Sequence, residues 1–253
     1  MATKKTSAKA SSKAQSATNN SNLIFRTPLG ALFGEFIGTF ILAAVVISVS
    51  GQPIFVLFAL TAIVLAVGTL SGGHVNPAIT FGAWITHRVS TLRALGYIVA
   101  QVLGAMLALV VLNAMVSGQP GQMNPLTGQA MAAEIFKAEA LTEGKEWYAF
   151  FAEMLGAGIF GFAVASALRE KRDRFAAAFT VGGGLFLGLI IAGSAAILNP
   201  AIAISLQALS WDTWPLAVYV FSPLVGAAIG FIIYQVLLDD VTHTNKLLKP
   251  RKK

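Results

Sequence analysis

The chain has 253 residues, of which 56% are hydrophobic and 11% charged, and its 18 Lys and Arg against 11 Asp and Glu give a formal net charge of +7. Soluble domains carry roughly 25% charged residues, so the composition excludes an ordinary soluble protein and indicates a membrane protein. The chain contains no cysteine, which excludes disulfides and thiolate sites.

The first part of the chain, residues 1–25, is rich in Lys, Ser, Thr, Ala and Asn. We expect a disordered basic tail there, because the segment cannot bury apolar surface. We interpret it as a solvated tail that reinforces topology, with binding to anionic lipid as the alternative. An organelle transit peptide would fit the absence of acids but not the absence of Arg. No cleavable signal peptide is expected, since the first 26 residues lack a long apolar stretch.

Six later segments are apolar over a length sufficient to cross a bilayer, which takes about 20 residues of helix. They are Pro28–Ser50, Pro53–Leu70, Ala94–Val116, Trp147–Leu168, Phe175–Gly193 and Thr213–Leu238. The sequence therefore predicts an all-α membrane protein whose membrane domain covers residues 26–240.

The basic residues fall mainly on one side of these spans, an uneven distribution that argues against a nucleic-acid-binding groove. That side holds 16 of the 18 Lys and Arg. They lie in the N-terminal tail, in the loops after the second and fourth spans, and in a basic tail at 241–253. Lys137 and Lys145 lie on the other side. Cytoplasmic loops are enriched in Lys and Arg, so we expect both termini in the cytoplasm. From the compact core of the chain we expect the plasma (inner) membrane as its location.

The tripeptide Asn-Pro-Ala occurs twice, at Asn76-Pro77-Ala78 and at Asn199-Pro200-Ala201. Asn is a strong N-cap, and Pro suits the first helical position, where its missing N–H is no loss. Each tripeptide therefore predicts a helix start, and each comes directly after a long apolar segment.

The two tripeptides belong to an internal repeat. Glu35 in the first span and Glu153 in the fourth each open a set of three spans, at about 28–116 and 147–238, and each set holds one tripeptide after its second span. An odd number of spans separates the sets, so they have opposite orientations. We expect two re-entrant half-helices at 76–87 and 199–210 that enter from opposite faces. Each extends 11 residues beyond its Asn, roughly 16 Å, about half of a hydrocarbon core.

The backbone before each Asn is expected to be irregular and to line a wet cavity, since free carbonyls at membrane depth need partners. Passing solute can supply them. The candidate pore-loop residues are Gly72, Gly73, His74, Ala195 and Ile197.

These residues resemble the aquaporin and aquaglyceroporin family. The motif from Ser71 to Thr80 is very similar to the family's, as are both Glu residues with their flanking Gly, Ala100-Gln101 with Gly104-Ala105, and the segment 223–227. The resemblance covers about residues 26–240. It implies a six-span channel with two half-helices, a homotetramer with one pore per subunit, and passage of water, glycerol or other small uncharged solutes without a cofactor.

Within that resemblance, Asn76 and Asn199 are the main pore candidates, each capping its half-helix with its oxygen and offering its amide donors to solute. Helix capping alone is the alternative. Glu35 and Glu153 are interpreted as braces that bond the re-entrant backbone, with a proton relay as the alternative. His74 would line the pore or sense pH, although a His at a bend more often bonds locally.

The sequence departs from the family at the outer filter. The family usually has Arg three residues after the second Asn, where this chain has Ile202. Counting as the family does gives Val56 at the usual aromatic position and Ala196 at the small-residue position. The neighbours Phe55 and Phe58 are the alternatives for the aromatic position if the register is shifted.

The fourth filter position falls at Leu189, Ile190 or Ile191, of which we take Ile190. This apolar filter predicts that bulkier or less polar neutral solutes gain relative to water, or that the neck dewets and closes.

Other functions are weaker predictions. A non-conducting scaffold or adhesion protein on the same fold is the main alternative, since the filter Arg is missing. A membrane enzyme or a proton-coupled transporter is the third alternative. The spans offer no nucleophile–base pair, phosphate loop or metal-ligand spacing for it, and their charged residues are the two repeat-related Glu. The outer segment at 117–146 holds no candidate site, with at most a short helix at Gly128–Ala140.

Overall fold

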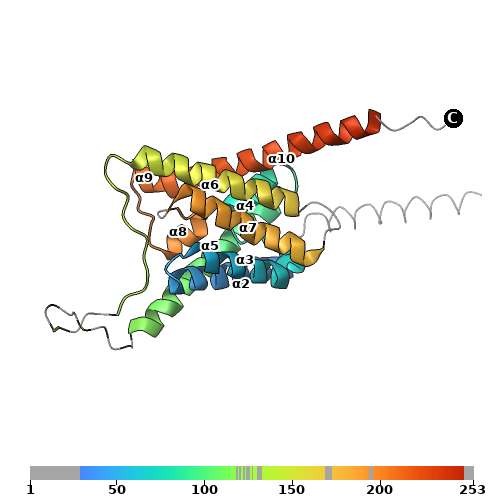
Figure 1. The fold of residues 1–253 in the computed structure, drawn as a ribbon. Coiled ribbons are helices and arrows are strands. Elements are labelled where there is room, and N and C mark those ends of the chain that lie inside the picture. Colours follow the sequence, from blue (N-terminus) through green and yellow to red (C-terminus); the bar gives the residue numbers. More distant parts are fainter. Residues whose placement is uncertain are drawn as a thin grey trace, which may run out of the picture.

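The computed structural model describes residues 29–117, 119, 121, 123, 126, 128–129, 133–168, 173–193 and 196–247. In these residues six long helices run side by side (Figure 1). They are α2 (Leu29–Ser48), α3 (Pro53–Ser71), α5 (Thr91–Ser117), α6 (Glu146–Ala167), α7 (Arg174–Ala192) and α10 (Ser222–Leu247). Before α10, the last span begins with α9 (Thr213–Leu216) and a π-helical turn (Ala217–Phe221), so that it runs from Thr213 to Thr244. All six are long and apolar enough to cross a membrane, which confirms the six predicted spans.

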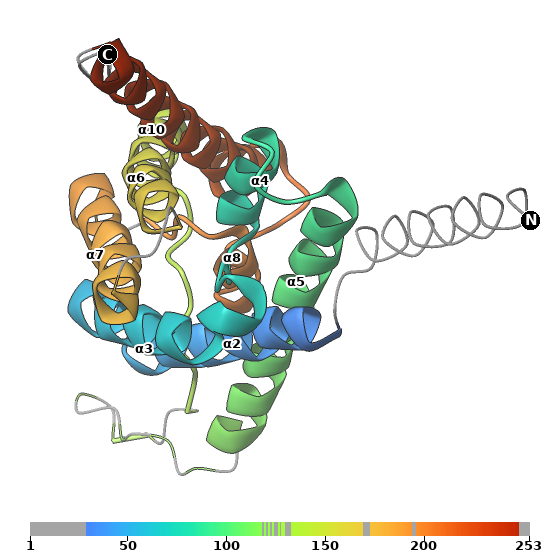
Figure 2. The ribbon, with the colours of Figure 1, turned by 90° about the vertical axis from the view of Figure 1, so that its right-hand side faces the viewer.

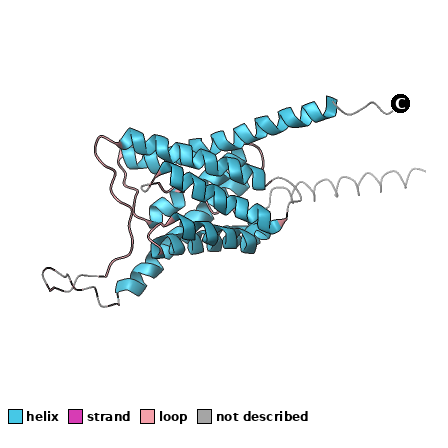
Figure 3. Ribbon diagram, viewed as in Figure 1, coloured by secondary structure: helices cyan, strands magenta, loops and turns pink. Residues whose placement is uncertain are grey.

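Two short helices, α4 (Pro77–Ile85) and α8 (Pro200–Ser205), begin at the two Asn-Pro-Ala tripeptides. Figure 2 looks along the bundle and shows both of them surrounded by the six long helices. The two short helices contact each other, and the N-cap Asn of each bonds the residue before the other Asn. The predicted all-α fold of six spans and two re-entrant half-helices is therefore confirmed, and Figure 3 shows its helical character.

The packing repeats between the two halves. Helix α2 packs against α3 and α5, and α6 packs in the same way against α7 and α10. The half-helices cross over, because α4 packs on α10 while α8 packs on α5. Each half-helix is thus held by the last span of the opposite half, as an inverted repeat requires.

The second half-helix is shorter than expected. The first stops at His87, whose φ is +58°, with Arg88 N donating to Ala83 O over 2.8 Å. The second stops at Gln207, φ +56°, which is only eight residues after Asn199 instead of the 11 expected. The carbonyl of Leu206, which another turn of helix would use, instead accepts a bond of 2.9 Å from Ala138 N.

That bond comes from the segment between α5 and α6, which passes over one end of the bundle (Figure 1). The helix suggested for Gly128–Ala140 is absent from the described residues 133–140, so this expectation was wrong. Ile135, only 8% exposed, and the partly buried Phe136 both pack on the hydrophobic core. These tertiary contacts hold the segment in an irregular conformation and override its local helix propensity.

The structure describes part of one of the two predicted tails. The tail predicted at 1–25 lies outside the described residues. The basic tail predicted at 241–253 is helical as far as Leu247, because α10 continues beyond the other helices (Figure 1).

Candidate functional site

The two half-helix tips are built by the same local bonds. Asn76 Oδ1 accepts from Ala78 N at 2.8 Å, and Asn199 Oδ1 accepts from Ala201 N at 3.0 Å and Ile202 N at 3.4 Å. Pro follows each Asn as the first helical residue. The tripeptides therefore form side-chain-capped helix starts, with Pro77, Ala78, Pro200 and Ala201 all buried.

The amide nitrogens of the same side chains link the two halves. Asn76 Nδ2 donates to Leu198 O over 2.9 Å, and Asn199 Nδ2 donates to Val75 O over 3.0 Å. An amide has two N–H groups. Among the described residues nothing takes the second N–H of either Asn, so one donor per tip remains for a solute. The sequence indicated free amide donors at both tips but gave no sign of these reciprocal bonds.

The residue before each Asn has an unusual backbone. Val75 has φ +41° and Leu198 has φ +58°, in the left-handed region that β-branched and bulky side chains rarely adopt. This conformation turns each carbonyl toward the opposite tip, where the Asn bond holds it. Such strained positions persist only when surrounding contacts fix them.

The two intramembrane carboxylates hold the strained loops. Glu35 is fully buried and accepts from His74 N at 2.9 Å and Val75 N at 2.7 Å. Glu153 is 2% exposed and accepts from Ile197 N at 2.5 Å and Leu198 N at 2.8 Å. Both carboxylates thus bond two consecutive backbone N–H groups at equivalent points of the repeat, which is the geometry of a brace.

The first half adds a polar network around its brace. Gln101 Nε2 donates to Glu35 Oε2 over 2.6 Å and to Thr80 Oγ1 over 2.9 Å. His74 Nδ1 lies 3.2 Å from Thr80 Oγ1, and the His74 ring contacts the edge of Tyr97. The Thr80 hydroxyl donates its hydrogen to Asn76 O, so His74 Nδ1 is the donor. His74 is therefore engaged locally and only 4% exposed, the arrangement expected of a His at a bend.

The loops before the Asn residues also present carbonyl oxygens. In the described part of the chain no hydrogen-bond donor reaches the carbonyls of Gly72, Gly73, His74, Ala196 or Ile197. Unpaired carbonyls at membrane depth are tolerated where they line a cavity that admits water or solute. The candidate Ala195 lies outside the described residues.

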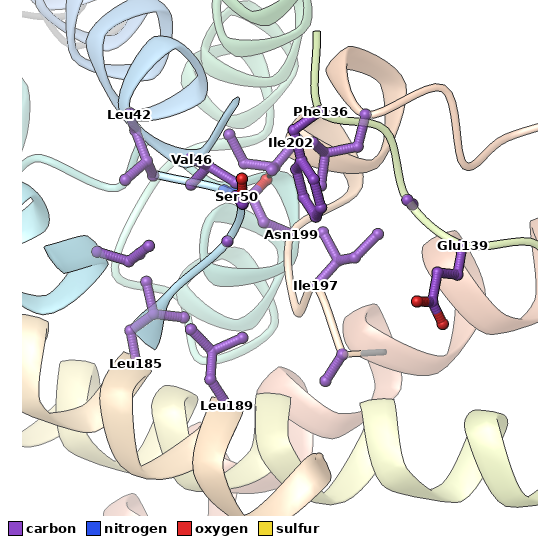
Figure 4. A pocket seen from close by; sticks show the side chains of 15 residues that line it. Leu42, Val46, Ser50, Phe136, Glu139, Leu185, Leu189, Ile197, Asn199 and Ile202 are labelled. Atoms are coloured by element: carbon purple, nitrogen blue, oxygen red, sulfur yellow. Dashed lines mark hydrogen bonds between the residues drawn. The ribbon is translucent and has the colours of Figure 1, made fainter. Parts of the chain in front are cut away.

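A cavity of about 250 Å³ opens on one side of the tips. Three of the four filter candidates, Val56, Ala196 and Ile202, line it together with Ile197 and Asn199 (Figure 4). In its described lining, polar side chains come from Ser50, Glu139 and Asn199, and none is a Lys or Arg. The cavity is thus a mainly apolar vestibule that ends at the side-chain amide of Asn199.

The fourth filter candidate was wrong. Ile190 is 56% exposed on the outside of α7, whereas Leu189 is 9% exposed and lines the cavity with Leu185 (Figure 4). One residue along a helix turns the side chain by about 100°, so a register error of one residue moves it from the cavity to the lipid. Phe55 and Phe58, at 51% and 58% exposed, also face outward.

Sequence reasoning missed several residues that line the cavity. They come from α2 and the loop after it, from the segment between α5 and α6, and from the end of the second half-helix: Leu42, Val46, Ser50, Gly51, Phe136, Ala138, Glu139 and Leu206. The signal for Phe136 was weak, because a single aromatic residue in a polar loop has no periodicity to place it.

The chain is similar to known proteins over most of its length. The family model described as "Major intrinsic protein" matches residues 28–234. The chain belongs to the major intrinsic protein family. This major intrinsic protein is 31% identical over 192 residues to "Aquaporin TIP1-1" of Zea mays, covering 74% of the chain and 70% of the relative. It is 32% identical over 178 residues to "Aquaporin TIP1-1" of Arabidopsis thaliana, covering 69% and 66%.

Its fold is also similar to a solved structure. The "X-ray structure of the aquaglyceroporin from Plasmodium falciparum" matches with a TM-score of 0.66 at 20% identity, covering 85% of this chain and 99% of the other. As a major intrinsic protein with six apolar spans, the chain is a multi-pass membrane protein of a family of channels. Family and relatives support a channel for water or small solutes and do not favour the alternative of a non-conducting scaffold.

Proposed function

We propose that this protein is a passive pore for neutral solutes that passes between Asn76 and Asn199 and through the apolar vestibule beside them. The observation that carries the proposal is the vestibule itself, whose wall includes Val56, Leu189, Ala196 and Ile202 and which ends at Asn199. A solute oxygen there would accept the free N–H of the Asn amides, while the loop carbonyls would accept from its hydroxyls.

Charged species are excluded by the two half-helices in this proposal. The N-cap Asn residues of α4 and α8 bond across to each other's loops, so the positive ends of both helix dipoles converge there. Cations are repelled, and a water bonded to both Asn amides is oriented so that a proton wire is interrupted. Without a filter Arg, ion exclusion rests on these dipoles and on desolvation.

The solute preference follows from Ile202. An Arg at this position would supply five N–H donors and a fixed charge, whereas Ile202 is an aliphatic side chain, 3% exposed, in the vestibule wall. A small polar solute that loses its hydration water in this neck gains fewer hydrogen bonds in return than it would beside an Arg. We therefore propose that glycerol-like solutes with an apolar face pass in addition to water.

The test is stopped-flow light scattering on proteoliposomes, challenged in turn with an impermeant osmolyte and with glycerol. Wild type should re-swell in glycerol well above empty liposomes. Ile202→Arg should lower the ratio of glycerol to water permeability by roughly tenfold, the effect of about 1.4 kcal/mol. The matched control is Ile190→Arg, which places the same side chain on the outward face of the channel. The Ile190→Arg protein that inserts should have the wild-type ratio of glycerol to water permeability.

Two results would contradict the proposal. Strict water selectivity in the wild type would refute the permissive neck. Fluxes equal to those of empty liposomes for both solutes would refute the open pore and favour the scaffold alternative.

The setting of the channel is also proposed. The excess of Lys and Arg on one side supports cytoplasmic termini. The plasma (inner) membrane is the proposed location, on the basis of the compact membrane core of the chain. The family resemblance supports a homotetramer with one pore per subunit. The domain limits, a basic tail at 1–25, a channel at 26–240 and a tail at 241–253, complete this proposal.

A further inference from the structure

The segment between α5 and α6 contributes to the outer vestibule, although it belongs to neither half of the repeat. Phe136, Ala138 and Glu139 from this segment line the same cavity as Ile202 (Figure 4). The wall of the candidate pore is therefore completed by a loop and not by spanning helices alone.

Two anchors fix this stretch of the loop. On one side of Phe136, Ile135 is 8% exposed and belongs to the hydrophobic core. On the other side, Ala138 N donates to Leu206 O at the end of the second half-helix, over 2.9 Å. Because Ile135 and Ala138 are both held, the Phe136 ring has a defined place at the vestibule.

The ring itself lies against the turn after α2. The ring lies over the side of Gly51 that has no side chain. A Cβ added there would be 3.5 Å from Phe136 Cε1, which is an ordinary van der Waals contact. Gly51 has φ +69°, a conformation that glycine adopts without strain. The ring is thus seated on one wall of the cavity with Gly51, and it packs on the core beneath.

Phe136 also replaces an aromatic that the spanning helices do not supply. Phe55 and Phe58, the aromatic residues nearest to Val56 in sequence, face outward, and Val56 itself is 2% exposed in the wall. Among the described residues of the lining, Phe136 is the aromatic one.

We propose that Phe136 is a specificity-determining residue whose ring sets the upper size of solute that enters the vestibule. This inference rests on the proposed function. The ring is planar, stiff and without a hydrogen-bond donor, so it limits width without compensating a solute's lost hydration. The solutes it admits would be compact neutral molecules such as short polyols and amides, and longer polyols would be excluded by size.

The experiment compares proteoliposomes of wild type, Phe136→Ala, Phe136→Trp and the control Phe55→Ala. Uptake is measured for water, glycerol and linear polyols of four and five carbons. Phe136→Ala should raise the ratio of five-carbon polyol to glycerol uptake by about tenfold or more, since one methylene of pocket space changes selectivity by that order. Phe136→Trp should lower the ratio of four-carbon polyol to glycerol. Phe55→Ala removes a ring of equal size that faces outward and should change neither ratio.

The outcomes separate this inference from the proposed function. If the wild type conducts and neither Phe136 variant shifts the ratios, Phe136 is not the size limit while the channel stands. If the wild type passes nothing but Phe136→Ala conducts, the ring is confirmed as the obstruction, and the open-pore proposal fails. If all four proteins are silent, both fail. If Phe136→Ala does not yield monodisperse protein, the ratio of four-carbon polyol to glycerol uptake in Phe136→Trp decides. A lowered ratio supports the size limit, and an unchanged ratio refutes it.

Discussion

At the scale of single residues, the two braces differ in how their charge is compensated. Glu35 accepts from two backbone N–H groups and from Gln101, whereas the described partners of Glu153 are the backbone N–H groups of Ile197 and Leu198. A buried carboxylate is costly unless it is well hydrogen-bonded. The second loop therefore depends on one side chain more completely than the first.

We expect Glu153→Ala to destabilise the protein by at least about 2 kcal/mol, because two buried N–H groups lose their acceptor at roughly 1–3 kcal/mol each. Tryptophan fluorescence during thermal unfolding in detergent measures the effect. Glu139→Ala is the control, since Glu139 is an exposed carboxylate and its removal should leave Tm unchanged. Equal Tm values for the two variants would show that the brace contributes no stability.

At the scale of elements, glycines set how closely the long helices approach. Helix α7 packs against α3, and a Cβ at Gly182 would come within 2.5 Å of Leu57 O. The adjacent Gly183 has nothing within 4 Å of the place where its Cβ would be. Small residues at helix contacts in membranes permit this close backbone approach.

This pair of neighbours allows a matched test. Gly182→Ala should lower the free energy of unfolding by about 1–3 kcal/mol, because the methyl group overpacks the contact with α3. Gly183→Ala should be neutral or stabilising by up to about 1 kcal/mol through helix propensity. Equilibrium unfolding in mixed micelles compares the two, and a loss of stability in both variants to the same extent would argue against the packing explanation.

The helices were predictable from the sequence to a greater extent than the loops and the cavity. Hydrophobic length predicted the six spans, and the Asn-Pro-Ala tripeptides predicted both half-helix starts, since these signals are local. The cavity position on α7 was wrong by one residue, from Ile190 to Leu189, because a nearly all-apolar helix has too little periodicity to fix its rotation. The loop at 133–140 and the early stop at Gln207 depend on each other through the bond from Ala138 N to Leu206 O, a long-range contact without a local signature.

At the scale of the whole molecule, the charge distribution predicts the orientation in the membrane. With Lys137 and Lys145 as the exceptions among 18 basic residues, the ends of the chain and the segment around Glu143 should lie on opposite sides of the membrane. The absence of cysteine makes this testable without removing native thiols.

We expect a single Cys at position 143, made by Glu143→Cys, to react with a membrane-impermeant maleimide in intact cells. Asp240→Cys, on α10, should react only after the cells are permeabilised. Both positions are exposed in the structure, so the difference reports sidedness and not burial. The reverse labelling pattern would contradict cytoplasmic termini.

The reciprocal bonds between Asn76 and Leu198 O and between Asn199 and Val75 O have a consequence for biosynthesis. The partners are 122 and 124 residues apart, so the first tip is made long before its acceptor leaves the ribosome. Until then the first half carries an unpaired amide and an unpaired carbonyl at membrane depth, which a lipid environment penalises. Closure of the tips is therefore a late event in maturation, and neither half completes its own centre without the other.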